Sequence, residues 1–321
     1  MADFFHIPVL AKEVVDTLTF SGKCRLIDGT LGGGSHSELL LKANPEAELL
    51  AIDRDEAALD AAAERLAFAG DRVFFRRGNY SEMFEYANEL EWDSVDGILL
   101  DLGISSPQID TPSRGFSWRF DGPLDMRMDN RSDMTAARLL NRASEDELRQ
   151  IFAEYGEFRG AFKLAREIVA RRQNEPFGST ADLVKVCDEV LGKSSPGKLP
   201  VPTLVFQALR IAVNDELGEL KRFLARSLAH LNKNGVVAII SFHSLEDRMV
   251  KDFFRRESID CLCPPGLPVC RCEHQAQLEI LYKKPLTAGK EELKNNPRSA
   301  CAKLRAAKKI SGGAARKNKY V

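Results

Sequence analysis

Three aspartates have the clearest chemical potential, because each closes a short apolar segment. Asp28, Asp53 and Asp101 end the segments 24–28, 48–53 and 95–101. A glycine-rich stretch at 29–34 follows the first, and backbone N–H groups in such a stretch are accessible to a ligand. Asp53 comes nineteen residues after Gly34, a position from which a carboxylate accepts hydrogen bonds from ribose hydroxyls. The pattern favours an adenosine-type ligand over a plain tight turn and a helix cap.

The glycine spacing separates two adenosine ligands. The dinucleotide pattern G-x-G-x-x-G is not met, because Ser37 stands where its third glycine would fall. A carboxylate at position 53 also disfavours the 2′-phosphate of NADP. Tyr80, which follows the segment 72–76, offers a flat ring to an adenine. We therefore favour S-adenosylmethionine, and a nicotinamide-dependent oxidoreductase is the disfavoured alternative.

These residues require a sheet to position them. Apolar segments alternate with helical patterns along the first hundred residues, which predicts parallel strands joined by helices; the strands are 24–28, 48–53, 72–76 and 95–101. Two later segments, 235–241 and 276–282, predict further strands. Helical patterns between them cover 145–155, 162–172, a segment capped at 179–182, and 203–231.

The simplest topology is an α/β, Rossmann-like sheet with an all-helical domain inserted after the fourth strand. We expect a discontinuous domain of residues 1–106 and 212–290 that binds the cofactor. Residues 107–211 would form a long loop and the helical insertion, which we expect to recognise RNA. Residues 291–321 would form a basic tail.

Composition narrows the class of protein. The 321 residues are 44% hydrophobic and 29% charged, which is typical of a globular protein with a buried core. No apolar run is long enough to cross a bilayer, and the first residues do not resemble a signal peptide. We therefore expect a cytoplasmic protein without a membrane partner. The seven cysteines do not resemble a secreted disulfide framework.

The charge distribution is uneven. The net charge is −1, but residues 283–321 contain twelve Lys or Arg against two Glu, an excess of +10. Such a segment is either an arm that contacts phosphates or a solvated end. The charge pattern alone does not separate these alternatives.

The loop after Asp101 carries candidate contacts to RNA. Arg114, Phe116, Trp118 and Arg127 combine aromatic rings with guanidinium groups, as in loops that stack bases and contact phosphates. The alternative is a hydrophobic cluster that anchors the loop, with its arginines paired to Asp121, Asp125 and Asp129. The two alternatives are compatible. Because 102–133 contains no cysteine, a covalent thiolate adduct with a pyrimidine ring is not expected.

Two further groups have open interpretations. His243 lies at the end of the predicted strand 235–241. It is either structural or part of the cleft at the ends of the strands. Cys261, Cys263, Cys270 and Cys272 are either a zinc site or reduced free thiols, since their C-x-C spacing differs from the usual C-x2-C knuckle. We expect no metal in the active site.

At this point the sequence resembles a known family, the bacterial small-subunit ribosomal RNA cytidine-N4 methyltransferases (RsmH, formerly called MraW). The resemblance covers nearly the whole chain. Its longest motif is Gly-Ile-Leu-Leu-Asp-Leu-Gly-Ile-Ser-Ser-Pro-Gln at 97–108. Other matching motifs lie at 6–10, 28–32, 51–55, 114–117, 121–129, 206–211, 240–248 and 296–299.

The resemblance implies methylation of the exocyclic N4 amine of a cytidine in the decoding region, with S-adenosylmethionine as cofactor. The implied partner is small-subunit ribosomal RNA in an assembled or assembling subunit, and a homodimer stays open. Carried over by position, the cofactor-binding residues are Gly34, Ser35, His36, Asp53, Tyr80, Asp101 and Gln108. The family usually has Gly-Gly-His where this chain has Gly-Ser-His, and Phe in place of Tyr80.

Methyl transfer to this amine needs alignment more than activation. Asp101, Ser105 and Pro107 are the candidates for positioning the target amine, through a carboxylate and backbone carbonyls. The identity of the proton acceptor is open. A non-catalytic ribosome-assembly factor that senses the cofactor is the alternative function, which the presence of Asp53, Asp101 and Gln108 disfavours.

Overall fold

The computed structural model describes residues 8–192, 199–264 and 270–310. The chain forms two compact units: a sheet unit of Met1–Gly103 with Glu219–Val321, and a helical unit of Ile104–Gly218. The first boundary lies slightly before the one expected from sequence, and the second lies several residues after it. The start of the motif at 6–10 and the last eleven residues of the expected tail lie outside the described residues.

The sheet unit contains one seven-stranded sheet with the order β3-β2-β1-β4-β5-β7-β6. Neighbouring strands from β3 to β5 run parallel, whereas β7 runs antiparallel to both β5 and β6. The strands are β1 (Arg25–Asp28), β2 (Glu48–Asp53), β3 (Val73–Arg77), β4 (Val95–Asp101), β5 (Leu231–Ser241), β6 (Leu278–Ile280) and β7 (Lys303–Lys309). The expected fold class, a Rossmann-like sheet with a helical insertion after its fourth strand, is confirmed.

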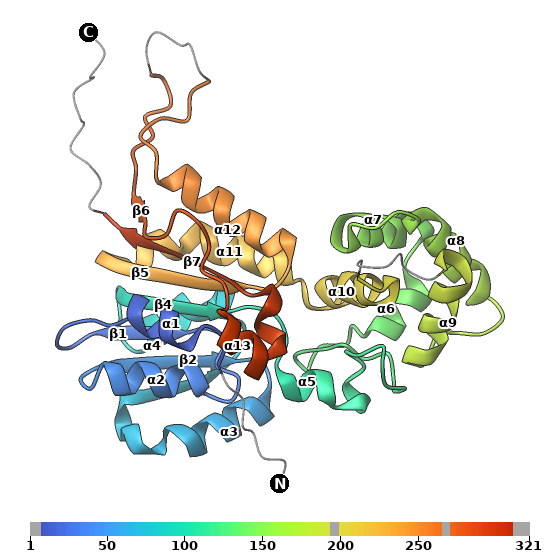
Figure 1. Ribbon diagram of the computed structural model, residues 1–321, viewed down its shortest axis with the longest axis horizontal. Coiled ribbons are helices and arrows are strands. Elements are labelled where there is room, and N and C mark those ends of the chain that lie inside the picture. Colours follow the sequence, from blue (N-terminus) through green and yellow to red (C-terminus); the bar gives the residue numbers. More distant parts are fainter. Residues whose placement is uncertain (1–7, 193–198, 265–269, 311–321) are drawn as a thin grey trace. The chain divides into compact units, whose positions relative to one another are not determined.

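Both faces of this sheet are buried, as expected for a parallel sheet covered by helices. Leu49 and Ala51 of β2 belong to one apolar cluster, and their neighbours Leu50 and Ile52 belong to the other. The first cluster packs under α1 (Ala11–Thr17), α2 (Ser35–Ala43) and α3 (Glu56–Leu66). The second packs under α4 (Met83–Glu89), α11 (Glu216–Ser227) and α12 (Ser244–Glu257) (Figure 1).

The helical unit has a separate apolar core, centred on fully buried side chains such as Phe152 and Leu164. Its helices are α5 (Ser106–Asp110), α6 (Ala136–Arg142), α7 (Glu145–Gly156), α8 (Ala161–Arg171), α9 (Thr180–Leu191) and α10 (Val201–Asn214). The expected cap of α9 is confirmed, since Ser179 and Asp182 form a capping box. The expected helical structure over 203–231 is confirmed, and it is divided: Asp215 adopts a left-handed conformation with φ 48° and separates α10 from α11.

The prediction of a basic tail is wrong for residues 291–310. These residues form α13 (Lys290–Asn295), a 3-10 turn and strand β7, whose Leu304, Ala306 and Ala307 are buried. Its basic side chains have partners inside the fold: Lys303 and Arg305 contact Asp247, Lys308 contacts Glu279, and Lys309 donates to the carbonyls of Leu228 and Leu231. The excess of positive charge concealed an apolar strand.

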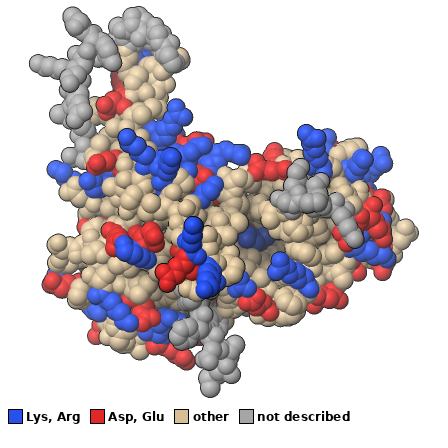
Figure 2. Space-filling view, viewed as in Figure 1, with Lys and Arg blue, Asp and Glu red and all other residues tan. Residues whose placement is uncertain are grey.

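Charges of both signs are mixed on the surface. On the face shown in Figure 2, acidic side chains lie among the basic ones over the part of the chain that the structure describes. In the described residues, no helix is both long and apolar enough to span a membrane.

Gly29, directly after β1, is a position where the fold excludes a side chain. A Cβ there would lie 2.6 Å from Cδ2 of Leu100 and 2.8 Å from Cβ of Tyr80. Because Tyr80 Cβ is fixed to its backbone, we expect Gly29→Ala to lower the free energy of unfolding by about 1–3 kcal/mol. Gly178→Ala is the control, since nothing lies within 4 Å of the Cβ position there. Equal stability of the two variants in urea denaturation would contradict this packing.

Candidate functional site

The strand order places a candidate site at one edge of the sheet. The order reverses between β1 and β4, which pair side by side with Asp28 opposite Leu99. In open α/β sheets, ligands bind outside the carboxyl ends of the strands at such a reversal. Asp28, Asp53 and Asp101 are the last residues of β1, β2 and β4, so all three carboxylates lie at this edge.

The glycine-rich turn between β1 and α2 leaves space at this edge. Gly32 has φ 51°, and a Cβ on it would meet nothing within 4 Å. Gly34 has φ 77° and is the N-cap of α2, where a Cβ would lie 3.1 Å from that of Ala62. Since glycine has no side chain to cap the helix, the first turn of α2 presents backbone N–H groups that favour an anion.

Asp53 is oriented by this turn. Its Oδ2 accepts a hydrogen bond from Gly32 N at 2.8 Å, and its Oδ1 accepts one from Asp55 N at 2.9 Å. Burial raises the pKa of the Asp53 carboxyl above its ordinary value, although both backbone N–H groups act in the opposite direction. Each carboxylate oxygen has a second lone pair, so Asp53 retains acceptor capacity for two hydroxyl groups.

Asp28 holds the site together from below. Its buried carboxylate accepts hydrogen bonds from Ser37 Oγ at 2.7 Å and from Thr30 N at 3.1 Å. Thr30 Oγ1 in turn accepts a hydrogen bond from Asp101 N at 2.6 Å. Burial raises the pKa of Asp28 to about 6. The network connects the ends of β1 and β4 with the first turn of α2.

Asp101 lies beside the buried ring of His36. His36 Nε2 lies 2.8 Å from the carbonyl oxygen of Val9, which only accepts, so Nε2 carries a proton. Burial lowers the pKa of His36, and a neutral ring with a proton on Nε2 has a lone pair on Nδ1. That Nδ1 lies 3.6 Å from Asp101 Oδ2. Two facing acceptors repel unless a proton lies between them, so this geometry favours protonation of the pair.

The other oxygen of Asp101 is a buried acceptor without a hydrogen-bond partner among the described residues. Burial, and secondarily the charge of Glu246, raise the pKa of Asp101 to about 7. An unpartnered carboxylate in this state is suited to a positively charged ligand or to a released proton.

Sequence reasoning did not identify Glu246 as part of this environment. Glu246 is buried at the start of α12, where its Oε2 accepts a hydrogen bond from Phe242 N at 3.0 Å. His243 is the N-cap of α12 and forms a capping box with Glu246. The signal was available, because His243 and Glu246 have the spacing of a capping box at the end of a predicted strand. His243 therefore has a structural role in the sheet unit.

Tyr80 lies inside the core and not on an open surface. Its side chain is 6% exposed, its ring meets the edge of Phe223, and the Arg54 guanidinium lies 5.8 Å from the ring centroid. A role beside an adenine ring stays a prediction.

Ser105, Pro107 and Gln108 belong to the helical unit. Ser105 is the N-cap of α5, Pro107 lies in its first turn, and Gln108 Oε1 accepts a hydrogen bond from Ser105 N at 3.1 Å. Gln108 is buried and stabilises this helix start. These three residues therefore share one short helix, whereas the other cofactor candidates lie in the sheet unit.

The four RNA-binding candidates are held within the helical unit. Arg127 forms two hydrogen bonds with Asp125, at 2.8 and 2.7 Å, and Arg114 donates to the carbonyl of Arg127 at 2.9 Å. Phe116 is buried, and Trp118 Nε1 donates to Thr203 Oγ1 at 3.0 Å. These contacts are those of the loop-anchoring alternative. A role in contacting RNA stays a prediction.

The comparisons with known proteins agree over almost the full chain. Residues 3–310 match the model of a family described as the MraW methylase family. A protein named ribosomal RNA small subunit methyltransferase H from Syntrophotalea carbinolica is 47% identical over 309 residues, 96% of this chain and 98% of that protein. A protein of the same name from Carboxydothermus hydrogenoformans is 46% identical over 310 residues, 96% of this chain and 99% of that protein.

The state of Asp101 predicts a pH-dependent stability. Its pKa is raised from 3.8 to about 7, so between these values the folded chain binds a proton that the unfolded chain has lost. The free energy of unfolding therefore falls as pH rises through this window. Asparagine stays neutral, so the free energy of unfolding of Asp101→Asn should not fall in this way. Relative to the unmodified chain, it should rise by on the order of 1–2 kcal/mol from about pH 5 to about pH 8. This is less than the full linkage value because the side chain is 19% exposed.

Urea denaturation at both pH values measures this difference. Asp60→Asn, on the exposed surface of α3, is the control and should show no such trend. A stability difference for Asp101→Asn that is the same at both pH values would contradict a protonated carboxyl.

Proposed function

The chain belongs to the MraW methylase family, and on this basis we propose that it methylates the exocyclic N4 amine of a cytidine in small-subunit ribosomal RNA. The methyl donor is S-adenosylmethionine. The reaction is the transfer of a methyl group, with loss of one proton from the amine.

The residues at the carboxyl edge of the sheet fit this cofactor. The first turn of α2, from Ser35, would hold the methionine carboxylate through backbone N–H groups, which makes a serine at this position compatible with binding. Asp53, fixed by Gly32 N and Asp55 N, would accept the ribose hydroxyls. The space at Gly32 leaves room for the ligand to approach the turn.

One observation carries the proposal, namely the unpartnered buried oxygen of Asp101 at the end of β4. A buried carboxylate oxygen without a hydrogen-bond partner is unfavourable in the absence of a ligand, and when ionised it is complementary to the positive charge of S-adenosylmethionine. A nicotinamide dinucleotide would bring additional phosphates towards three aspartates at this edge. The charge arrangement therefore favours the sulfonium cofactor.

The chemistry requires alignment and a destination for a proton. When bound, S-adenosylmethionine supplies an activated methyl group on a sulfonium. The cytosine amine is a weak nucleophile because its lone pair is delocalised, so the protein must hold both N–H groups in place. We assign this positioning to Asp101 and to the backbone around Ser105 and Pro107. With a pKa of about 7, the Asp101 carboxylate also accepts a proton near neutral pH.

The RNA would contact the helical unit. Of the loop residues, Arg114 and Arg127 have partners within the loop, whereas Phe120 is exposed and the Arg119 guanidinium lies 5.6 Å from the Trp118 ring centroid. The exposed ring of Phe120 would suit a stacked base, and the exposed guanidinium of Arg119 would suit a phosphate. Because small-subunit RNA is the substrate, the reaction takes place in the cytoplasm on an assembled or assembling subunit. A homodimer is compatible with this function and is not required by it.

A non-catalytic assembly factor is the second candidate. Such a protein would sense the cofactor and would need no proton acceptor. The raised pKa of Asp101 favours the enzyme, because a group poised near neutral pH is typical of proton transfer.

Asp53→Ala should weaken binding of S-adenosylmethionine by roughly 2–4 kcal/mol, because two charge-assisted hydrogen bonds are lost. Calorimetry measures this affinity, with NAD expected to give no binding signal. Asp55→Ala is the matched control: it removes the cap of α3 and lowers stability without touching the ribose. Unchanged affinity in folded Asp53→Ala, or saturable binding of NAD, would overturn the assignment of the cofactor site.

Small-subunit particles incubated with the protein and S-adenosylmethionine should yield N4-methylcytidine after digestion, as measured by mass spectrometry of nucleosides. RNA carrying 5-fluorocytidine at the target should be methylated without a covalent complex, since no cysteine lies in the loop 102–133. A stable protein–RNA adduct, or a 5-methylcytidine product, would refute transfer to the amine. Particles without any new methylated nucleoside would favour the assembly factor.

A further inference from the structure

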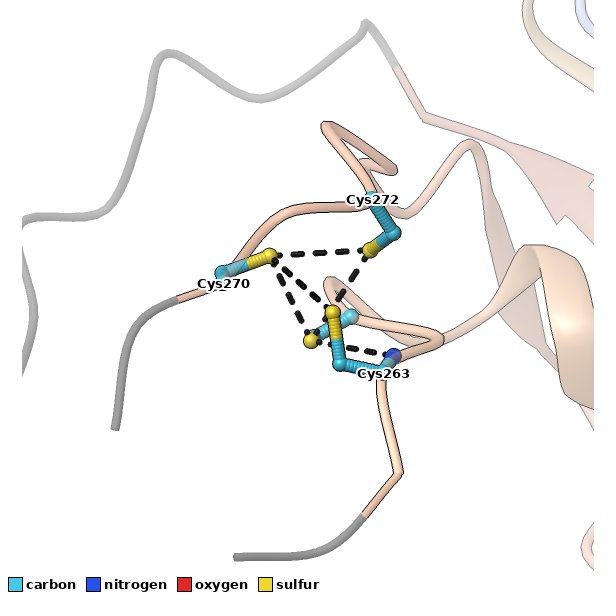
Figure 3. A group of neighbouring side chains, drawn as sticks. Cys263, Cys270 and Cys272 are labelled. Carbon is cyan, nitrogen blue, oxygen red and sulfur yellow. Dashed lines mark hydrogen bonds between the residues drawn. The ribbon is translucent and has the colours of Figure 1, made fainter. Parts of the chain in front are cut away.

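Four cysteines converge in the segment that connects α12 to β6 (Figure 3). The Sγ atoms of Cys261, Cys263, Cys270 and Cys272 all lie within 4.8 Å of one another. The recorded Sγ–Sγ distances are 3.4 Å (261–270), 4.0 Å (263–270), 3.5 Å (270–272) and 3.9 Å (261–272). None of the four is in a disulfide.

These distances match the edges of a coordination tetrahedron. Zinc–thiolate bonds are about 2.3 Å long, so tetrahedral geometry separates neighbouring sulfurs by about 3.8 Å. A disulfide bond, in contrast, would require about 2.05 Å. The observed distances scatter around the tetrahedral value and lie far from the disulfide value.

Backbone N–H groups point at the sulfurs. Leu262 N lies 3.2 Å from Cys272 Sγ, Arg271 N lies 3.3 Å from Cys263 Sγ, and Cys263 N lies 3.4 Å from Cys261 Sγ. Such hydrogen bonds stabilise thiolates over thiols and orient metal ligands from outside the coordination sphere. Each C-x-C pair therefore has the backbone arrangement of a thiolate cluster.

The described residues of the segment 258–277 are held by hydrogen bonds and not by an apolar core. At its base, Gln277 N donates to Glu257 O at 2.8 Å, and His274 Nε2 lies 2.9 Å from Arg256 O. Among the described residues of 258–277 none is buried, and Ile259 and Leu262 are 41% and 43% exposed. A segment without an apolar core needs a cross-link to be ordered, which a metal ion supplies.

We propose that Cys261, Cys263, Cys270 and Cys272 bind one zinc ion as four thiolates. Four sulfur ligands select zinc over the harder divalent cations, and they leave no open position for a substrate. The site is therefore structural. His274, whose ring contacts Arg256 O, is not a ligand. This assignment does not depend on the proposed methyl transfer.

Elemental analysis of the full-length chain, purified under reducing conditions, should find about one zinc ion per molecule. Replacement of zinc by cobalt(II) should give the intense visible bands of a tetrahedral thiolate site. Cys263→Ser and Cys270→Ser should each lower the zinc content at low zinc concentration by about tenfold or more. Cys301→Ser is the matched control, because Cys301 is an exposed free thiol outside the cluster. It should retain the zinc.

A second measurement uses the unmodified chain and does not depend on folding of a variant. A mercurial thiol reagent should release zinc, detected with a metallochromic dye, and should expose the segment 258–277 to protease while the rest of the sheet unit stays intact. The proposal would be overturned if the purified protein contained no zinc and its four cluster thiols reacted with the reagent as fast as the thiol of Cys301. Two disulfides among the four cysteines would overturn it as well. They would be detected as the loss of two hydrogens per disulfide from the intact mass.

Discussion

The buried carboxylate of Asp28 fixes the geometry on which the candidate site depends. It accepts hydrogen bonds from the Ser37 hydroxyl of α2 and from the Thr30 backbone N–H in the glycine-rich turn. The Thr30 hydroxyl oxygen in turn accepts a hydrogen bond from the backbone N–H of Asp101 in β4. Three elements that meet at the strand-order reversal are thereby linked through the side chains of Asp28 and Thr30. Because Asp28 is buried, water cannot replace a lost partner. Loss of one partner would leave a buried acceptor unsatisfied, which lowers the free energy of unfolding by about 1–3 kcal/mol. Gly32, Gly34 and His36 lie between Thr30 and Ser37, the two residues that donate to this carboxylate.

The cost of this arrangement is electrostatic. Burial raises the pKa of Asp28, of Asp53 and of Asp101, so the edge of the sheet gathers three carboxyl groups that are reluctant to ionise. The backbone N–H groups of Gly32 and Asp55 stabilise the Asp53 carboxylate, and the Ser37 hydroxyl stabilises that of Asp28. Asp101 lacks such a donor on Oδ1 among the described residues. A ligand with a positive charge would stabilise this oxygen electrostatically, and its binding to the folded state alone would then stabilise the protein.

Sequence patterns predicted the parts of the fold in which local chemistry and position agree. The strands that end in Asp28, Asp53 and Asp101 are apolar runs with an acidic stop, and the structure has all three. Strand β7 was missed because Lys303, Arg305, Lys308 and Lys309 mask its buried residues, and their partners Asp247 and Glu279 are distant in sequence. The break at Asp215 was missed since a left-handed residue leaves no mark in helical periodicity. The capping role of Glu246 could be read from its spacing to His243, but its effect on the pKa of Asp101 depends on the packed sheet. Likewise, the C-x-C spacing does not by itself reveal that the two pairs converge.

The place of β7 in the sheet has a consequence for the order of folding. The sheet is complete only when residues 303–309 insert between β5 and β6. In addition, β4 pairs with β5 although the whole helical unit separates these two strands in the sequence. Contacts of such long sequence separation form slowly, because the chain entropy of closing a large loop precedes the gain from pairing. During synthesis, the first four strands would wait with the edge of β4 unpaired while the continuous stretch 104–218 is made. The helical unit, which is continuous in sequence, would fold in that interval and shorten the effective loop that β5 and β7 must close.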